Sequence, residues 1–179
     1  TGAVNQYVTN VGDAEVQGIE IDSVISLTDD LVLSLSAGYI DASYAAVTKD
    51  ISGDGTVATG PIVNAADLAL ELPRAAPLTW SIGLNRFGSY EGWTTNSRIS
   101  LAHRDKSFFT DNNKGFINKQ NVLNAGLDFT SPDGSTSIGI YGNNLTNEVR
   151  HGGDTQLSFG SYAPLMKGRV IGLEGTYNF

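Results

Sequence analysis

Residues 171–179 read Ile-Gly-Leu-Glu-Gly-Thr-Tyr-Asn-Phe, and their odd and even positions differ in character. The odd positions are apolar or glycine, namely Ile171, Leu173, Gly175, Tyr177 and Phe179, whereas the even positions are small or polar. Successive side chains of a β-strand point to opposite faces, so this alternation predicts a strand with one apolar and one polar face.

The same period of two runs through most of the chain. It is found in seven stretches, at roughly 14–28, 31–45, 77–87, 92–108, 118–130, 135–144 and 166–179. The segment around Gln6 to Thr9 is interpreted as an eighth, partial strand or as the start of the first one. No amphipathic helix is evident, so the pattern predicts an all-β, antiparallel up-and-down meander of seven or eight strands.

The connections between these stretches alternate in length. Short ones with turn residues lie at Asp29-Asp30, at 88–92 and at Ser131-Pro132-Asp133-Gly134, and long ones lie at about 46–76, 109–117 and 145–165. Transmembrane β-barrels have short turns at one end and long loops at the other, and several stretches here greatly exceed the ~5–6 residues usual in soluble strands. The pattern therefore predicts a transmembrane barrel wall.

Composition narrows the possible functions. The 179 residues include 19 acidic and 11 basic side chains, a net charge of -8 and no cysteine. Nucleic-acid binding needs a basic surface, so no nucleic-acid partner is predicted. The absence of cysteine excludes disulfides, thiolate metal sites and cysteine nucleophiles. Thr1 is not a methionine and no signal peptide follows it, so we expect a mature or truncated chain.

Candidate chemical groups are few. Asp50, Ser52 and Asp54, followed by Gly55, resemble the opening of a calcium loop, but the twelfth position, which requires glutamate, is Pro61. A polar outer loop is the favoured interpretation, and calcium from outside the cell is left open.

The two histidines are too few for a metal or catalytic site. His103 lies near the outer end of a predicted strand, and both His103 and His151 are interpreted as exposed residues, although His151 or Arg150 is a candidate for ligand contact. Asp29-Asp30 is interpreted as a turn. No enzyme activity is predicted, and no catalytic, cofactor-binding or metal residue is assigned.

The predicted faces separate charge from aromatic side chains. Charged residues of the polar face are expected to solvate the barrel interior and to pair with one another; they are Glu20, Asp22, Arg98, Arg104, Asp128 and Glu174. Aromatic residues end the apolar faces, with Trp93, Phe129 and Phe179 at one end and Tyr39 toward the other. We interpret them as interfacial girdles rather than as a sugar-binding platform.

Five motifs follow one another along the whole chain. They are Asn10-Val11-Gly12-Asp13-Ala14-Glu15-Val16-Gln17-Gly18-Ile19-Glu20, Ala37-Gly38-Tyr39-Ile40-Asp41-Ala42-Ser43-Tyr44, Ala76-Pro77-Leu78-Thr79-Trp80, Ile140-Tyr141-Gly142-Asn143-Asn144-Leu145-Thr146-Asn147-Glu148, and Gly168-Arg169 before a strand that ends in Phe179. In this order they resemble the C-terminal barrel of TonB-dependent outer-membrane receptors.

The resemblance implies that residues 1–179 are the C-terminal part of a receptor barrel of about 22 strands, without the plug and the N-terminal strands. It implies uptake of a scarce nutrient, most often an iron–siderophore chelate, with vitamin, haem or glycan as alternatives. The implied partners are outer-membrane lipid, a small molecule in the outer loops, the TonB complex through the plug, and the insertion machinery through the C-terminal strand.

The implied location is the Gram-negative outer membrane, with the long loops outside the cell, the C-terminus in the periplasm and charged lumen residues that dock the plug. Two other classes remain open from the sequence. One is a non-transporting structural or adhesive barrel of eight strands, and the other is a soluble β-sandwich that binds a ligand.

Overall fold

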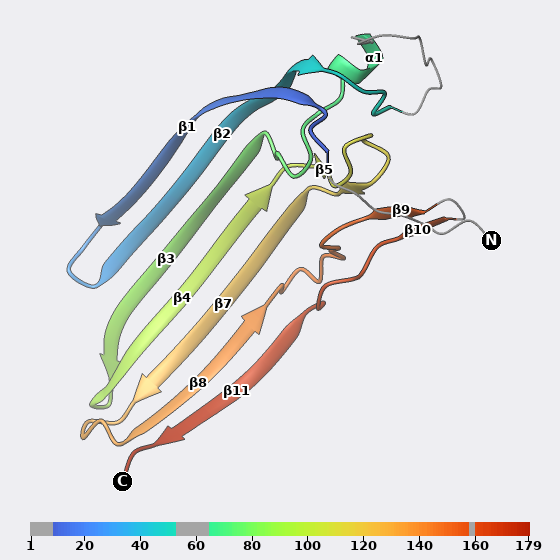
Figure 1. Ribbon diagram of the computed structural model, residues 1–179. Helices are drawn as coiled ribbons and strands as arrows, with labels where there is room; N and C mark the ends of the chain where they lie inside the picture. The colour runs from blue at the N-terminus through green and yellow to red at the C-terminus, as the bar shows by residue number, and fades with distance from the viewer. Residues whose placement is uncertain (1–8, 53–64, 158–159) are drawn as a thin grey trace.

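The computed structural model describes residues 9–52, 65–157 and 160–179, so most of the partial strand predicted around Gln6 to Thr9 lies outside the described residues. Seven long strands form one antiparallel sheet in the order β1-β2-β3-β4-β7-β8-β11 (Figure 1). Their bounds are β1 (Gly12–Ser26), β2 (Leu31–Val47), β3 (Leu78–Tyr90), β4 (Trp93–Arg104), β7 (Gln120–Thr130), β8 (Thr136–Asn143) and β11 (Val170–Tyr177).

The connections are sorted between the two ends of the sheet, as the sequence predicts. Figure 1 shows the three tight turns and the C-terminus at one end and the long connections at the other. Glu91 and Gly92 form the shortest turn with φ values of 48° and 84°, and Tyr90 pairs with Trp93 across it. Two successive positive φ values characterise the type I′ turn that matches the twist of a hairpin. The meander is therefore confirmed.

The long connections contain short elements of their own. The β2–β3 connection holds α1 (Ala65–Leu68), the β4–β7 connection holds the paired β5 (Ser107–Phe108) and β6 (Phe116–Ile117), and the β8–β11 connection holds the paired β9 (Thr155–Leu157) and β10 (Gly160–Tyr162). Among the described residues, no helix has the length and apolar character needed to cross a membrane.

Two predicted strand boundaries are wrong. The stretch 92–108 divides into β4, which ends at Arg104, and β5, because the last ladder bond is donated by the Asp105 amide to the Leu78 carbonyl and the chain then turns away. The final strand begins at Val170 rather than at 166, after the Arg169 amide has bonded to the Asn147 side chain.

The register brings like residues together across the sheet. On one face Leu35 pairs with Ile82, Ile82 with Leu101, and Leu101 with Leu123. On the other face the rows are small or polar, such as Ser36–Ser81 and Gly83–Ser100–Asn124. Because directly opposed residues share a face, the predicted apolar and polar faces are confirmed.

The apolar face is left open. Leu173 on β11 is 80% exposed, and Ile19, Ile21 and Ile25 on β1 are also exposed. The buried residues instead lie at the loop end of the sheet and in the long connections: Val47, Ala76, Ile117, Asp67, Ser107, Asn144 and Asp154. A soluble sandwich packs a second sheet onto such a face, and the described residues contain only two further sheets, each of two short strands. The sandwich interpretation therefore lacks its second layer.

Candidate functional site

The polar face of the sheet carries an ion pair between two of the charged residues expected there. Arg98 on β4 pairs through Nη1 with Asp128 on β7. Two glycines make room for these side chains: a Cβ at Gly126 would lie 2.7 Å from the Arg98 guanidinium, and one at Gly139 would lie 2.6 Å from Asp128 Oδ1. The pair therefore lies flat across the sheet, as the expected pairing within the lumen requires.

A cavity of about 560 Å³ opens beside this pair. It spans five strands, and its polar lining consists mainly of amides with one charge of each sign: Asn85, Arg98, Asn124, Tyr141, Asn143 and Glu174. Tyr141 lies over Gly172, where a Cβ would be 2.5 Å from its hydroxyl oxygen. This arrangement suits hydrogen bonding to a polar solute or a polar polypeptide segment rather than burial of an apolar one.

The remaining charges predicted on the polar face do not join the pair. Glu20, Asp22 and Glu174 are exposed on β1 and β11, and the described residues give none of them an ion-pair partner. Arg104, at the end of β4, donates from Nη2 to the Arg74 carbonyl at 3.1 Å and to Ser107 Oγ at 3.3 Å. Arg104 therefore connects β4 to the β2–β3 and β4–β7 connections through hydrogen bonds.

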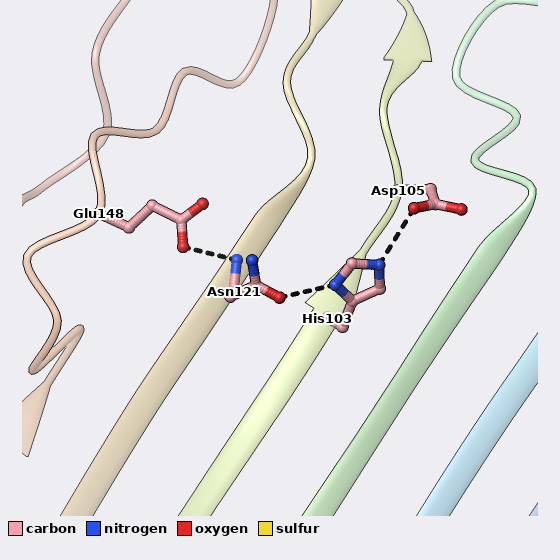
Figure 2. Close-up of polar contacts among 4 residues, drawn as sticks. All are labelled: His103, Asp105, Asn121 and Glu148. Atoms are coloured by element: carbon pink, nitrogen blue, oxygen red, sulfur yellow. Dashed lines mark hydrogen bonds and ion pairs between the residues drawn. The ribbon is translucent and has the colours of Figure 1, made fainter.

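A chain of polar contacts crosses the loop end of the sheet (Figure 2). Glu148 Oε2 accepts a hydrogen bond of 2.6 Å from the backbone amide of Asn121. The side-chain oxygen Oδ1 of Asn121 lies 2.7 Å from His103 Nδ1. His103 Nε2 lies 3.1 Å from Asp105 Oδ1. A carboxylate only accepts, so Nε2 carries the proton in this contact. These polar contacts link the β8–β11 connection to β7 and β4.

The interpretation of His103 as an exposed loop residue is wrong, although its place near the end of a strand is confirmed. It lies on β4, its side chain is 14% exposed, and it stacks on Trp80 with ring centroids 5.4 Å apart and an interplanar angle of 15°. Two of its partners, Trp80 and Asn121, come from the neighbouring strands β3 and β7, which the order of the sequence alone does not reveal.

The three long connections meet in a group that we call the outer loop cluster, formed by residues 71–76, 107–117 and 150–154. The Glu71 amide donates to Asn113 Oδ1 at 2.7 Å, and Asn113 Nδ2 donates to the Glu71 carbonyl at 2.8 Å. A Cβ at Gly115 would lie 2.1 Å from the Asp154 carbonyl oxygen. The loops are thus packed against one another and not independent.

Cations and aromatic rings alternate in and beside this cluster. Arg74 lies 4.8 Å from the Phe109 ring centroid, and Lys106 lies 4.7 Å and 4.8 Å from those of Phe108 and Phe116. His151 meets Phe116 edge to face at 6.3 Å. Aromatic and cationic groups together favour planar organic molecules. Contact of a ligand with His151 or Arg150 stays a prediction, and the Arg150 guanidinium bonds to the Lys167 carbonyl.

The acidic motifs have different outcomes. Asp30 lies in the β1–β2 turn as predicted, and the Thr28 hydroxyl and then the Arg86 guanidinium lower the pKa of its carboxyl. In the calcium-like motif, Asp54 to Pro61 lie outside the described residues. Among the residues that are described, no three His, Asp or Glu side chains are grouped to hold a metal.

Asp67 is a residue that sequence reasoning missed. It is fully buried on α1, and its Oδ1 accepts hydrogen bonds from the amides of Ile51 and Ser52. Its neighbours in the sequence, Ala-Ala before and Leu after, carry no recognisable signal.

The chain matches no family model and no curated protein. It is similar to three solved structures at low identity. The ferric yersiniabactin uptake receptor FyuA from Yersinia pestis has a TM-score of 0.78 and 13% identity, and the match covers 95% of this chain and 24% of that one. The siderophore receptor PiuA from Acinetobacter baumannii has a TM-score of 0.64 and 17% identity, with 93% and 22% covered.

The third structure is BauA, the ferric preacinetobactin receptor from Acinetobacter baumannii, with a TM-score of 0.67 and 16% identity over 96% of this chain and 23% of that one. The chain thus spans about a quarter of the length of each receptor. All three solved structures are of receptors, in keeping with the prediction that the chain is not an enzyme. The antiparallel barrel wall implied by the resemblance to TonB-dependent receptors is therefore the fold of this chain.

Proposed function

We propose that the chain is part of a TonB-dependent outer-membrane receptor that takes up iron bound to a siderophore. The observation that carries this proposal is the two-faced sheet of long strands, which has the fold of siderophore receptors over 95% of the chain in FyuA. The apolar face suits membrane lipid, and the polar face with its cavity suits a water-filled or plugged lumen.

We also propose that residues 1–179 form the C-terminal part of a larger barrel domain. In a meander of seven antiparallel strands, β1 and β11 run in the same direction, so joining them directly would create a parallel pair. Antiparallel closure needs an odd number of further strands, and lipid does not tolerate unpaired edges. A barrel of about 22 strands meets this requirement, as does an eight-stranded barrel with one additional strand.

The proposed orientation places the three long connections outside the cell and the tight turns and C-terminus in the periplasm. Barrels of this type keep their short turns periplasmic. Residues 1–179 contain no cysteine, so a cysteine introduced here is the only one in this part of the receptor. In intact cells, a membrane-impermeant maleimide should label Val149→Cys, whose parent residue is 73% exposed, but not Asp29→Cys in the β1–β2 turn. The reverse pattern would invert the topology.

The proposed ligand region is the outer loop cluster together with the polar-face cavity below it. In the complete receptor, energy would come from the TonB complex through the plug, which would dock on the polar face. Siderophores are the favoured cargo because the three similar structures are a ferric yersiniabactin uptake receptor, a siderophore receptor and a ferric preacinetobactin receptor. Vitamin, haem and glycan are the alternatives.

Uptake by cells that produce the complete receptor tests this function. A panel of radioactive ferric siderophores is offered with and without a functional TonB complex, alongside haem and a vitamin. We expect uptake of one ferric chelate that depends on TonB and falls several-fold in Phe116→Ala, with Val149→Ala as the exposed loop control. Uptake of none of the panel would favour the structural or adhesive barrel instead.

A further inference from the structure

The second carboxylate oxygen of Asp67 is one of five buried side-chain polar atoms in the described chain that lack a hydrogen-bond partner. Asp67 has no exposed surface. Its Oδ1 accepts from the Ile51 amide at 2.9 Å and from the Ser52 amide at 2.8 Å. Its Oδ2 is shielded from solvent and has no hydrogen-bond partner among the described residues. One oxygen of this carboxylate is therefore hydrogen-bonded within the described chain, and the other is not.

Such an oxygen is costly to bury. A buried polar atom without a partner costs on the order of 1–3 kcal/mol, and a charged one costs more. No lysine or arginine among the described residues forms an ion pair with Asp67. An unsatisfied oxygen on a fully buried carboxylate points to an ion or a water at that position.

Further oxygen ligands lie on the segment that Asp67 contacts. Ser52 donates its amide to Asp67, and its hydroxyl bonds to Asp50 Oδ1 at 3.2 Å, so Ser52 connects the two carboxylates. Asp50 and Ser52 occupy the first and third positions of the calcium-like motif. The motif lacks its twelfth-position carboxylate because Pro61 stands there, and Asp67 on α1 supplies a carboxylate to the same segment from another element.

We propose that Asp50, Ser52 and Asp67 hold a calcium ion. Calcium takes six to eight oxygen ligands, accepts irregular geometry and retains water at positions that the protein leaves open. Two carboxylates and a hydroxyl offer only oxygen donors, which suits calcium better than a transition metal. With so few protein ligands, the expected dissociation constant is ~10⁻⁴–10⁻³ M, the range of extracellular calcium modules.

The bound ion would join α1 to the start of the β2–β3 connection, because Asp67 belongs to the first and Asp50 and Ser52 to the second. This proposal does not depend on iron uptake. It concerns a site that an adhesive barrel with the same connection would share.

Calcium titration of the complete, chelator-treated receptor in detergent tests the site. Isothermal titration with calcium chloride should show a site in the wild type that weakens at least tenfold in Asp67→Asn. That substitution keeps an oxygen for the two amides but removes the charge. Asp133→Asn, in the β7–β8 turn, is the matched control and should bind as the wild type does. Equal calcium binding by the wild type and Asp67→Asn would overturn the proposal.

A second variant and a folding check keep the test decisive. Each sample is first shown to be folded by its heat-modifiable migration on a gel. If Asp67→Asn does not fold, Asp50→Asn takes its place, with the same tenfold loss expected. Folded wild-type receptor without saturable calcium binding up to ~10⁻² M, above the expected range, would show that water occupies the site and would refute the proposal. The calcium titration involves no iron. A negative result in it would therefore refute the calcium site without bearing on the proposed iron uptake.

Discussion

Trp80 on β3 and His103 on β4 are directly opposed across two strands, and their rings stack with centroids 5.4 Å apart. The stack lies on the apolar face, two residues beyond the Ile82–Leu101 pair and next to it on that face. The polar contacts of His103 with Asn121 and Asp105 begin at this level. We infer that the stack marks the outer border of the apolar band, where an amphipathic ring suits the membrane interface.

The stack should couple the two residues energetically. In a double-mutant cycle of Trp80→Ala and His103→Ala, we expect an interaction free energy of about 0.5–1.5 kcal/mol in the stability of the folded barrel. Urea unfolding of the complete receptor in lipid vesicles measures it. The distant pair Trp80→Ala and His151→Ala should be additive. Additivity of the first pair would show that the contact contributes no stability.

The two faces of β3 should differ in their tolerance of charge. Ile82 lies between Leu35 and Leu101 on the apolar face, whereas the adjacent Ser81 lies between Ser36 and Ala102 on the polar face. Ile82→Lys should lower the free energy of unfolding by ~2–4 kcal/mol if it lies near the bilayer midplane, and Ser81→Lys should cost far less. Equal losses in a vesicle unfolding assay would contradict the assignment of the lipid face.

The outer loop cluster should loosen when Gly115 gains a side chain. A Cβ there would overlap the Asp154 carbonyl at 2.1 Å, whereas a Cβ at Gly152 meets no atom within 4 Å. Overpacking costs about 1–3 kcal/mol, so Gly115→Ala should speed amide exchange in the β5–β6 hairpin by roughly 5–150-fold. Gly152→Ala is the control. Hydrogen-exchange mass spectrometry that finds the two variants alike would contradict the packed cluster.

The β7–β8 turn should lose stability in acid through Asp133. The Ser131 hydroxyl, the Ser135 amide and the Ser135 hydroxyl all donate to this carboxylate and lower its pKa. The pKa of this carboxyl is about 3.9 in the unfolded chain and lower in the folded protein. The ionised carboxylate therefore stabilises the folded state at pH values above about 3.9, and this stabilisation is lost as the pH falls through the folded pKa. The stability difference between wild type and Asp133→Asn should therefore be constant above about pH 5 and shrink below pH 4. A difference that does not change with pH would exclude this role.

Much of the fold follows from local pattern. The alternation in 77–87 and 171–179 predicts both faces of β3 and β11, because the period of a strand is local and exact. The end of β4 at Arg104 is set by the last ladder bond, from the Asp105 amide to the Leu78 carbonyl, and a bond to another strand leaves no mark in the local sequence. Asp67 and the contacts of His103 with Trp80 and Asn121 were also missed, since these contacts join segments that are distant in sequence.

The C-terminal residue should matter for assembly and not for synthesis. Phe179 is exposed and lies on the same face as the apolar residues of β11. Its ring centroid lies 6.3 Å from that of Tyr177. At the proposed periplasmic end of the barrel, this ring would sit in the aromatic girdle. The resemblance to TonB-dependent receptors further implies that a C-terminal aromatic strand is read by the outer-membrane insertion machinery.

Deletion of Phe179 from the complete receptor should therefore reduce the assembled, heat-modifiable barrel several-fold while total synthesis stays constant. Phe179→Ser should have the same effect, because the lost feature is the ring. Asn178→Ser is the control: its backbone amide donates to the Ser135 carbonyl, and that bond does not depend on the side chain. The barrel fraction is measured on unheated gels of outer-membrane extracts. Normal assembly of both Phe179 variants would count against recognition of this strand, since the apolar row from Ile171 to Tyr177 would then suffice by itself.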